Sequence, residues 1–174
     1  MKKIAQFHKV SQSQFLKDWS NCFINVSNEE VDKIYSEIML PKRATIGSAG
    51  YDFFAPVEIN LNPSESMLIP TGIRVSIEDG WVLKCYPRSG LGFKFRLQLN
   101  NTVGIIDSDY YYSENEGHIF AKITNDSKEE KKVNVPKRAG FIQGIFLEYG
   151  ITYNDCVEEV RNGGFGSTTE KKIL

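Results

Sequence analysis

The sequence predicts an all-β domain that follows a helical segment and precedes a glycine-rich tail. From Pro41 onward, short apolar or alternating runs are interrupted by Gly, Pro, Asn and Asp at roughly ten-residue intervals, a pattern typical of β-sandwiches and β-barrels. Residues 1–38 contain no Gly or Pro, and their apolar residues recur at helical spacing. A chain of 174 residues with 41% apolar content can form one core without disulfides.

The N-terminal segment is expected to contain an amphipathic helix over about residues 28–39. Ser27 can accept the backbone N–H of Glu30 while the Glu30 carboxylate reaches back, which is a capping box. Apolar residues from Val31 to Ile38 form one stripe, and the opposite face is charged. The stripe therefore predicts docking on the remainder of the domain or on a neighbouring subunit, rather than a membrane helix.

The β region, residues 39–160, is expected to hold strands separated by turn residues such as Asn62-Pro63 and Asp79-Gly80. Strands are predicted at 66–77, 81–86, 95–99, 102–106, 118–124, 131–135 and 141–149. Helices are expected to contribute little here. Residues 161–174 have too many glycines and too few apolar side chains to pack, so we expect a flexible tail that a ligand orders.

Charge and cysteine content argue against several classes of function. The 21 Lys+Arg balance 22 Asp+Glu, so the chain has no basic field that would recruit nucleic acid or anionic lipid. The 3 cysteines form no CxxC pair and are expected to be reduced thiols. No apolar run reaches the length of a secretory signal or a membrane span. We therefore expect a cytoplasmic protein that binds neither nucleic acid nor membrane.

Donors suited to phosphate oxygens occur in two glycine-bearing segments. Arg88 offers a guanidinium group beside the Ser89 hydroxyl and the Gly90 amide. Ser167 and Thr168 lie beside glycine amides near the end of the chain. In a chain without net positive charge, these donors indicate a small phosphorylated ligand, although each segment alone is also compatible with a solvated turn.

Asp107 follows two isoleucines, so we expect its carboxylate at the end of a buried strand, where it suits a general base that activates water. Asp109 either shares that face or caps a turn. The rings of Tyr110 and Phe165 lie in polar segments, where they either stack on a sugar or base or pack in the core.

The two histidines lack neighbours at zinc-like spacing, so a protein-ligated transition metal is not expected. A Mg²⁺ ion carried by phosphates needs only one or two nearby carboxylates, which Asp52 and Asp107 can supply through water. Neither a Walker A sequence nor a GxGxxG motif occurs, so P-loop and Rossmann sites are excluded.

Taken in order, five segments resemble the motifs of the trimeric dUTPases. They are Ala49-Gly50-Tyr51-Asp52, Pro87-Arg88-Ser89-Gly90-Leu91, Gly104-Ile105-Ile106-Asp107-Ser108-Asp109-Tyr110, Gln143, and Gly163-Gly164-Phe165-Gly166-Ser167-Thr168. The resemblance covers about residues 39–169. It implies a jelly-roll β-barrel, a homotrimer with active sites shared between subunits, and Mg²⁺-assisted hydrolysis of dUTP to dUMP and pyrophosphate.

The resemblance also implies roles for single residues. Asp107 would activate the attacking water, and Asp52 would support the metal indirectly, through water. Arg88, Ser89 and Gly90 of a neighbouring subunit would lie along the phosphates, and Gln143 would approach the phosphates or the nucleotide-side backbone. Arg161, Ser167 and Thr168 would clamp the γ-phosphate, and Gly166 would also bind the substrate. A hairpin containing Asn101, Gly104 and Ile106 would recognise uracil. Tyr110 would pack against the deoxyribose and exclude a 2′-hydroxyl, and Phe165 would stack on the base as the tail closes.

The chain departs from the family pattern in three respects. Gly140 stands where the family usually has Arg, three residues before Gln143, and Arg161 lies one residue closer to Phe165 than usual. The N-terminal 38 residues and the segment from Tyr111 to Glu116 are extra. Both additions are candidate sites for subunit contacts or a protein partner, or they are ordinary surface elaborations.

Two alternative functions remain open at this point. A dCTP deaminase shares the fold, although the segments around Asp107 and Phe165 favour dUTP hydrolysis. A dUTP-gated regulatory protein is the second alternative, in which tail closure exposes or hides the insertion for a protein partner.

Overall fold

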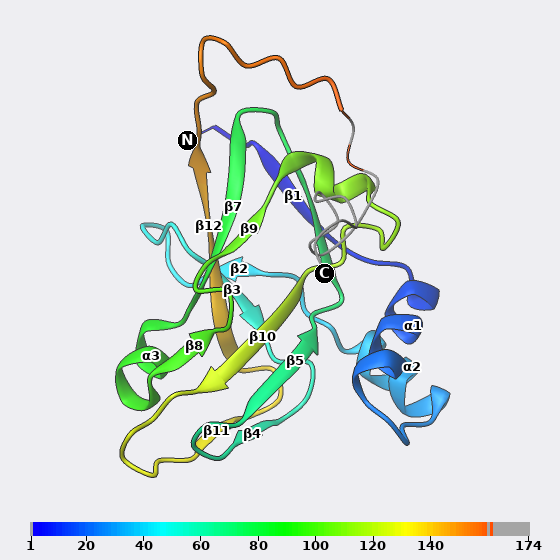
Figure 1. The fold of residues 1–174 in the computed structure, drawn as a ribbon. Coiled ribbons are helices and arrows are strands. Elements are labelled where there is room, and N and C mark those ends of the chain that lie inside the picture. The colour runs from blue at the N-terminus through cyan, green and yellow to red at the C-terminus, as the bar shows by residue number, and fades with distance from the viewer. Residues whose placement is uncertain (1, 160, 162–174) are drawn as a thin grey trace, which may run out of the picture.

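A computed structural model describes residues 2–159 and 161, and it confirms the all-β class with a helical segment near the N-terminus (Figure 1). The first elements are β1 (Ala5–Lys9), α1 (Gln12–Cys22) and α2 (Asn28–Ser36). They are followed by β2 (Lys42–Arg43), β3 (Tyr51–Phe54), β4 (Ile59–Leu61), β5 (Ser66–Pro70), β6 (Ile73–Ile77), β7 (Trp81–Pro87), α3 (Ser89–Phe95), β8 (Leu97–Leu99), β9 (Gly104–Ile106), the 3₁₀ helix η1 (Ser108–Tyr112), β10 (Phe120–Asn125), β11 (Val133–Val135) and β12 (Gly140–Glu148).

The described strands form four antiparallel sheets and do not close into one barrel. The largest has the order β2-β3-β12-β7-β9, and a second has the order β5-β10-β8. The pairs β11-β4 and β1-β6 complete the arrangement. Strand β12 organises the large sheet because its nine residues pair with β3 on one side and with β7 on the other.

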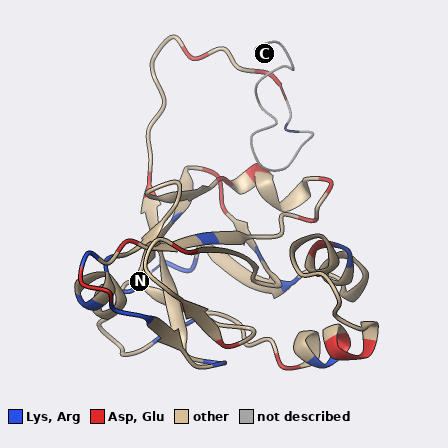
Figure 2. Ribbon diagram, turned by 60° about the horizontal axis from the view of Figure 1, so that its bottom comes forward, with Lys and Arg blue, Asp and Glu red and all other residues tan. Residues whose placement is uncertain are grey.

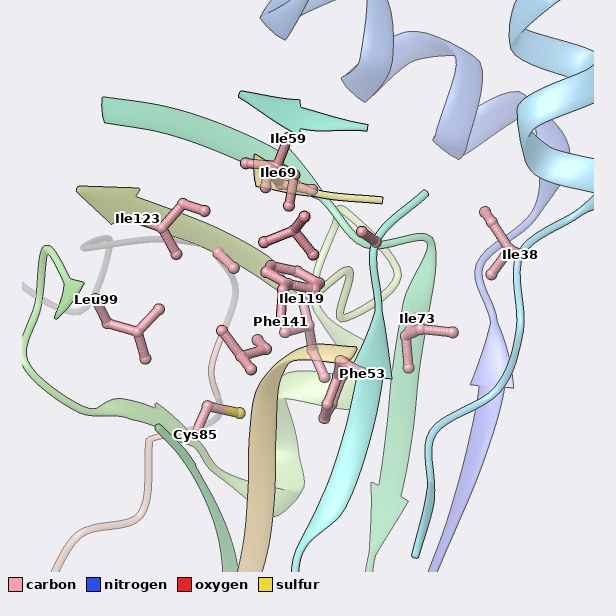
Figure 3. Packing of buried hydrophobic residues seen from close by; sticks show 14 of the residues in the cluster. Ile38, Phe53, Ile59, Ile69, Ile73, Cys85, Leu99, Ile119, Ile123 and Phe141 are labelled. Carbon is pink, nitrogen blue, oxygen red and sulfur yellow. The ribbon is translucent and has the colours of Figure 1, made fainter. Parts of the chain in front are cut away.

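The core lies between the two larger sheets (Figure 3). Phe53 and Phe141 from the five-stranded sheet and Ile69 and Ile123 from the three-stranded sheet are at most 1% exposed. Each such side chain contributes about 1.5–3 kcal/mol by leaving water. This packing makes the sheets a rigid base for the loops at their ends.

The N-terminal segment is only partly helical, so the prediction for residues 1–38 needs a correction. Ala5–Lys9 forms a strand because it pairs with β6, from Ala5 opposite Ile77 to Lys9 opposite Ile73. The sequence of the segment does not reveal this distant backbone partner. Helix α2 carries the predicted capping box and ends three residues before the expected boundary. Its buried Val31 joins the core cluster, which confirms docking on its own domain.

The other differences between the predicted and observed secondary structure have local causes. The predicted strand over 66–77 is divided into β5 and β6 at Gly72, whose φ of +74° is incompatible with a continuing strand. The short strands β2, β3 and β4 were not predicted, because two to four residues are too few to show an alternating pattern. Helix α3 occupies Ser89–Phe95, part of the β region in which little helix is expected from the sequence.

Lys and Arg are interspersed with Asp and Glu over the described elements, in agreement with the balanced composition (Figure 2). Within residues 2–159 and 161, no helix is both long and apolar enough to cross a membrane.

Replacing Ser27 with alanine tests the capping box. Ser27→Ala removes the side-chain acceptor for the Glu30 N–H and should lower the free energy of unfolding by about 1 kcal/mol. Chemical denaturation measures this change. Ser20→Ala on the exposed face of α1 is the control and should leave stability unchanged or slightly raised, because alanine favours helix. Equal stability of both variants would contradict the assigned role of the cap.

Candidate active site

Three of the predicted site residues lie together at one end of the five-stranded sheet, and we call them the Arg88 cluster: Asp52, Arg88 and Gln143. Register explains their proximity, because Gln143 of β12 lies between Asp52 of β3 and Tyr86 of β7. Arg88 Nε lies 3.2 Å from Asp52 Oδ1, and Gln143 Nε2 donates to the Pro87 carbonyl at 3.3 Å. The carboxylate of Asp52 therefore orients the guanidinium group of Arg88 within the chain.

Two glycines leave the space that the Arg88 cluster occupies. A Cβ atom on Gly140 would lie 2.9 Å from Arg88 Nη1, and a Cβ on Gly50 would lie 2.7 Å from Gln143 Oε1. The departure at Gly140 therefore provides room for Arg88. Arg138, the basic residue five positions before Gln143, has its Nη2 atom 4.0 Å from Oε2 of Glu37.

Ser89 and Gly90, both predicted to bind phosphate, lie in the first turn of α3. Arg88 is the N-cap, and its side chain makes no capping hydrogen bond. Backbone N–H groups in the first turn of a helix lack intrahelical acceptors, so they remain available to an external anion.

A second group, the Asp107 cluster, consists of Asp107, Asp109, Tyr110 and Arg161. Asp107 directly follows β9 and the buried Ile106, as the sequence predicts. Arg161 Nη2 donates to Asp107 Oδ2 at 2.8 Å, and Arg161 Nε lies 3.2 Å from Asp109 Oδ1 without the alignment of a hydrogen bond. The two carboxylate side chains are 46% and 50% exposed, so water reaches them.

Tyr110 is 5% exposed and is held from two sides. Its hydroxyl donates to the His118 carbonyl at 2.7 Å and accepts from Asn115 Nδ2 at 2.9 Å. Burial raises the pKa of the Tyr110 phenol, and this effect outweighs the hydrogen bond from Asn115. The guanidinium carbon of Arg161 lies 5.6 Å from the ring centroid. Sequence reasoning identified Tyr110 but gave no role to Asn115 and His118, because their hydrogen bonds to the Tyr110 hydroxyl depend on how residues 111–118 fold back over the ring.

The segment predicted to recognise the base connects β8 of the three-stranded sheet to β9 of the five-stranded sheet. The prediction of a hairpin is therefore wrong, because β8 pairs with β10 and β9 pairs with β7. Thr102 has a φ of +66°, and its N–H donates to the Leu99 carbonyl at 2.8 Å, which makes the turn. Gly104 at the start of β9 leaves room for Cys85, because a Cβ on this glycine would lie 3.1 Å from Cys85 Cβ, closer than ordinary van der Waals contact. Cys85 is buried, and burial raises the pKa of its thiol to about 12, which makes it unsuited to nucleophilic chemistry.

The two clusters lie at opposite ends of the same sheet. Ile106 of β9 pairs with Leu83 of β7, so Asp107 lies level with Val82, and Arg88 lies six residues further along. At about 3.3 Å per residue, their Cα atoms are about 20 Å apart. One copy of the chain therefore does not bring Asp107 and Arg88 to the same phosphate group.

Some of the remaining predicted site residues lie outside the part of the chain that the structure describes. Phe165, Gly166, Ser167 and Thr168 lie outside the described residues. Within the described part of the chain, no group of three or more His, Cys, Asp or Glu residues is arranged to hold a metal ion. In the insertion from Tyr111 to Glu116, the Tyr111 ring centroid lies 3.6 Å from the Arg74 guanidinium carbon, while Tyr112 is 81% exposed.

Comparison with known proteins identifies what the chain resembles. A dUTPase family model matches residues 36–169. The deoxyuridine 5′-triphosphate nucleotidohydrolase of Lactococcus lactis is 42% identical over 134 residues, which are 75% of this chain and 88% of that protein. The corresponding protein of Finegoldia magna is 43% identical over 136 residues, or 74% and 90% of the two chains.

Solved dUTPase structures are also similar to this chain. A dUTPase from Streptococcus mutans is 35% identical with a TM-score of 0.58, and the match covers 67% of this chain and 90% of that one. A mutant dUTPase from phage phi11 of S. aureus, described with a structural Mg(II) ion, has a TM-score of 0.59 at 20% identity and therefore supports the fold alone. That match covers 90% of this chain and 98% of the phage protein.

Gly140→Ala tests the placement of Arg88. The added Cβ should displace the Arg88 guanidinium group from Asp52. The predicted charge-assisted contact of Arg88 with phosphate would then weaken, so the KM for dUTP should rise about tenfold. Steady-state kinetics measure this effect. Gly47→Ala is the matched control, because a Cβ there meets nothing within 4 Å. An unchanged KM in Gly140→Ala would show that Arg88 does not contact the substrate.

Proposed function

Because this chain belongs to the dUTPase family and hydrolyses dUTP, we propose that Asp107 activates the water that attacks the substrate. The observation that carries this role is the place of Asp107 directly after β9, half exposed to solvent and beside the buried Tyr110. A general base needs a fixed position and access to water, and the end of this strand offers both. The products are dUMP and pyrophosphate.

The proposed step is an in-line displacement at the α-phosphorus. Asp107 accepts a proton from the water as its oxygen bonds to phosphorus, and the bond from phosphorus to the leaving pyrophosphate oxygen breaks. Arg161 already holds Oδ2 of Asp107, so we assign the attacking water to Oδ1. Arg161 also provides a cation that can move to a substrate phosphate, the role that its place before the glycine-rich tail predicts.

We assign the phosphates to the Arg88 cluster and the first turn of α3. The ion pair with Asp52 supports this assignment because it orients Arg88 before substrate arrives. Amides of Ser89 and Gly90 supply further donors, and Gln143 contributes from the adjoining strand. Gly166, Ser167 and Thr168 are proposed to close over the phosphates.

Base and sugar selection are assigned to the segment between β8 and β9 and to the following 3₁₀ turn. Asn101, Gly104 and Ile106 are proposed to present the surface that accepts uracil, and Phe165 to stack on it. Tyr110 is proposed to pack against the deoxyribose. Its burial and the two hydrogen bonds of its hydroxyl support a fixed ring that excludes a 2′-hydroxyl by contact.

Magnesium is proposed as the cofactor, held mainly by substrate phosphates. The chemistry of the described residues fits this arrangement, because carboxylates of Asp52 and Asp107 are hard oxygen donors that can reach the ion through water. They are too few and too dispersed for a metal centre built by the described chain alone. When bound, the ion neutralises negative charge that develops on the phosphates.

A homotrimer with shared active sites is the proposed assembly. The separation of about 20 Å between Asp107 and Arg88 supports it, because a second copy must supply the missing cluster. Strand β9 lies at an edge of the large sheet with Ile105 50% exposed, which offers apolar surface for such a contact.

A cytoplasmic location is also proposed, and the free thiols of Cys22, Cys85 and Cys156 support it.

Asp107→Asn is expected to abolish turnover while substrate binding persists. The amide keeps the shape of the carboxylate but accepts no proton, so kcat should fall at least about 100-fold. Pyrophosphate release from dUTP with Mg²⁺ measures kcat, and calorimetry measures binding. Asp32→Asn on α2 is the control and should behave as the unmodified chain. Ammonia release from dCTP would instead indicate a deaminase, and dUTP binding without turnover by the unmodified chain would indicate a regulatory protein.

Complementation between two inactive variants tests site sharing. Asp107→Asn and Arg88→Ala should each be inactive alone, whereas refolding them together at equal amounts should restore roughly a quarter of the activity, because half of the chains supply each intact cluster. Size-exclusion chromatography establishes that mixed oligomers form. Persistent inactivity of such oligomers would show that each site uses one chain.

A further inference from the structure

The N-terminal extension reaches the Asp107 cluster through a buried histidine. Asp18 of α1 accepts from His118 Nδ1 at 2.6 Å, and the Gly72 N–H donates to His118 Nε2 at 2.8 Å. Since Nε2 accepts a hydrogen bond, it carries the lone pair and the ring proton lies on Nδ1. The His118 side chain is 0% exposed, so this hydrogen bond fixes the ring and the backbone of His118.

A second connection passes through the insertion. Glu116 Oε2 accepts the backbone N–H of Ser11 at 2.7 Å, and Glu116 Oε1 accepts the Ser11 hydroxyl at 2.6 Å. Ser11 is the N-cap of α1, so Glu116 ties the insertion to the start of that helix. Burial raises the pKa of Glu116, but the hydrogen bonds from Ser11 and the charge of Arg74 outweigh it and lower the pKa overall.

The two connections meet at the Tyr110 hydroxyl. It donates to the carbonyl of His118, whose ring is held by Asp18, and it accepts from Asn115, the neighbour of Glu116. Tyr110 also closes the 3₁₀ turn that follows Asp107, the proposed general base, because the Tyr110 N–H donates to the Asp107 carbonyl at 3.2 Å. The extension and the insertion, which are both extra to the family pattern, thus form one continuous set of contacts with the turn that carries Asp107.

Close packing leaves this turn little freedom to move alone. A Cβ on Gly117, which has a φ of +68°, would lie 2.6 Å from the Tyr110 carbonyl oxygen and 2.8 Å from Tyr111 Cα. Both are backbone atoms, so a shift of the insertion displaces the backbone of η1 directly.

We propose that Asp18 and Glu116 are positioning residues for the active site, through which the N-terminal extension fixes Tyr110 and the adjoining Asp107. Neither residue touches the substrate. The inference rests on the proposed function, because Tyr110 and Asp107 matter for catalysis only if they contact sugar and water. If Asp18 and Glu116 act in this way, loss of either connection should impair sugar selection and turnover in variants that remain folded.

The test compares Asp18→Ala and Glu116→Ala with neighbours on the same elements. Lys17→Ala and Glu114→Ala are the matched controls, because both side chains belong to exposed residues. The conservative variants Asp18→Asn and Glu116→Gln retain an acceptor for the hydrogen bond. Three quantities are measured for each purified full chain: kcat and KM for dUTP, the ratio of kcat/KM between dUTP and UTP, and hydrogen exchange of the peptide spanning residues 107–117.

Both alanine variants should lower kcat/KM for dUTP about tenfold, since a small displacement of a positioned group costs one or two orders of magnitude in rate. Preference for dUTP over UTP should fall, and exchange over residues 107–117 should accelerate. The conservative variants should recover most of the loss. If Asp18→Ala does not fold, Glu116→Ala still tests the inference. The Glu116 side chain is 32% exposed, so its removal should disturb folding less than removal of the buried Asp18.

Unchanged exchange and unchanged dUTP/UTP preference in folded alanine variants would overturn the inference. Equal loss on both nucleotides, matched by a loss of folded protein, would also overturn it and leave a purely structural role. Failure of the proposed function gives a different result, since the unmodified chain and both controls would then release no pyrophosphate from dUTP. The exchange measurement still reports on the positioning contacts in that case.

Discussion

The antiparallel register of β7 against β9 and β12 is the constraint on which the candidate site depends. Pairing of Leu83 with Ile106 sets Asp107 at one end of the sheet, and pairing of Tyr86 with Gln143 sets the Arg88 cluster at the other. Side chains can change rotamer, but a strand cannot slip by one residue without turning its buried face to solvent. The separation is therefore a property of the fold, and it supports the proposed sharing of active sites between copies of the chain.

Ion pairs within each cluster orient groups without holding them irreversibly. Arg88 with Asp52, and Arg161 with Asp107, are partly exposed pairs, and such pairs contribute only about 0–1 kcal/mol to stability. A triphosphate offers a denser negative charge and competes easily for either guanidinium group. The rigid backbone positions the two arginine side chains, and their weak ion pairs leave the guanidinium groups available to bind phosphate. This division suits the proposed site, in which Arg161 leaves a carboxylate before it contacts a phosphate.

Sequence reasoning succeeded where the determinant was local. The capping box at Ser27 and the strand end at Asp107 depend on residues within one segment, and both were predicted. Strand β1 was missed because its partner β6 lies about seventy residues away. The Asp18–His118 hydrogen bond was missed for the same reason, since it joins residues 100 positions apart. Contacts of this kind depend on tertiary packing and leave no periodic signal in one sequence.

The two additions to the family pattern are best understood together. The N-terminal segment alone buries Phe15 and Trp19, which would suffice to explain its retention as a stabilising element. That account does not explain why the insertion, distant in sequence, directs Glu116 to the N-cap of α1 and Asn115 to Tyr110. A surface elaboration needs no contact with the site, whereas a positioning device needs a continuous path to it. The described contacts form that path and end at the residue next to the proposed deoxyribose.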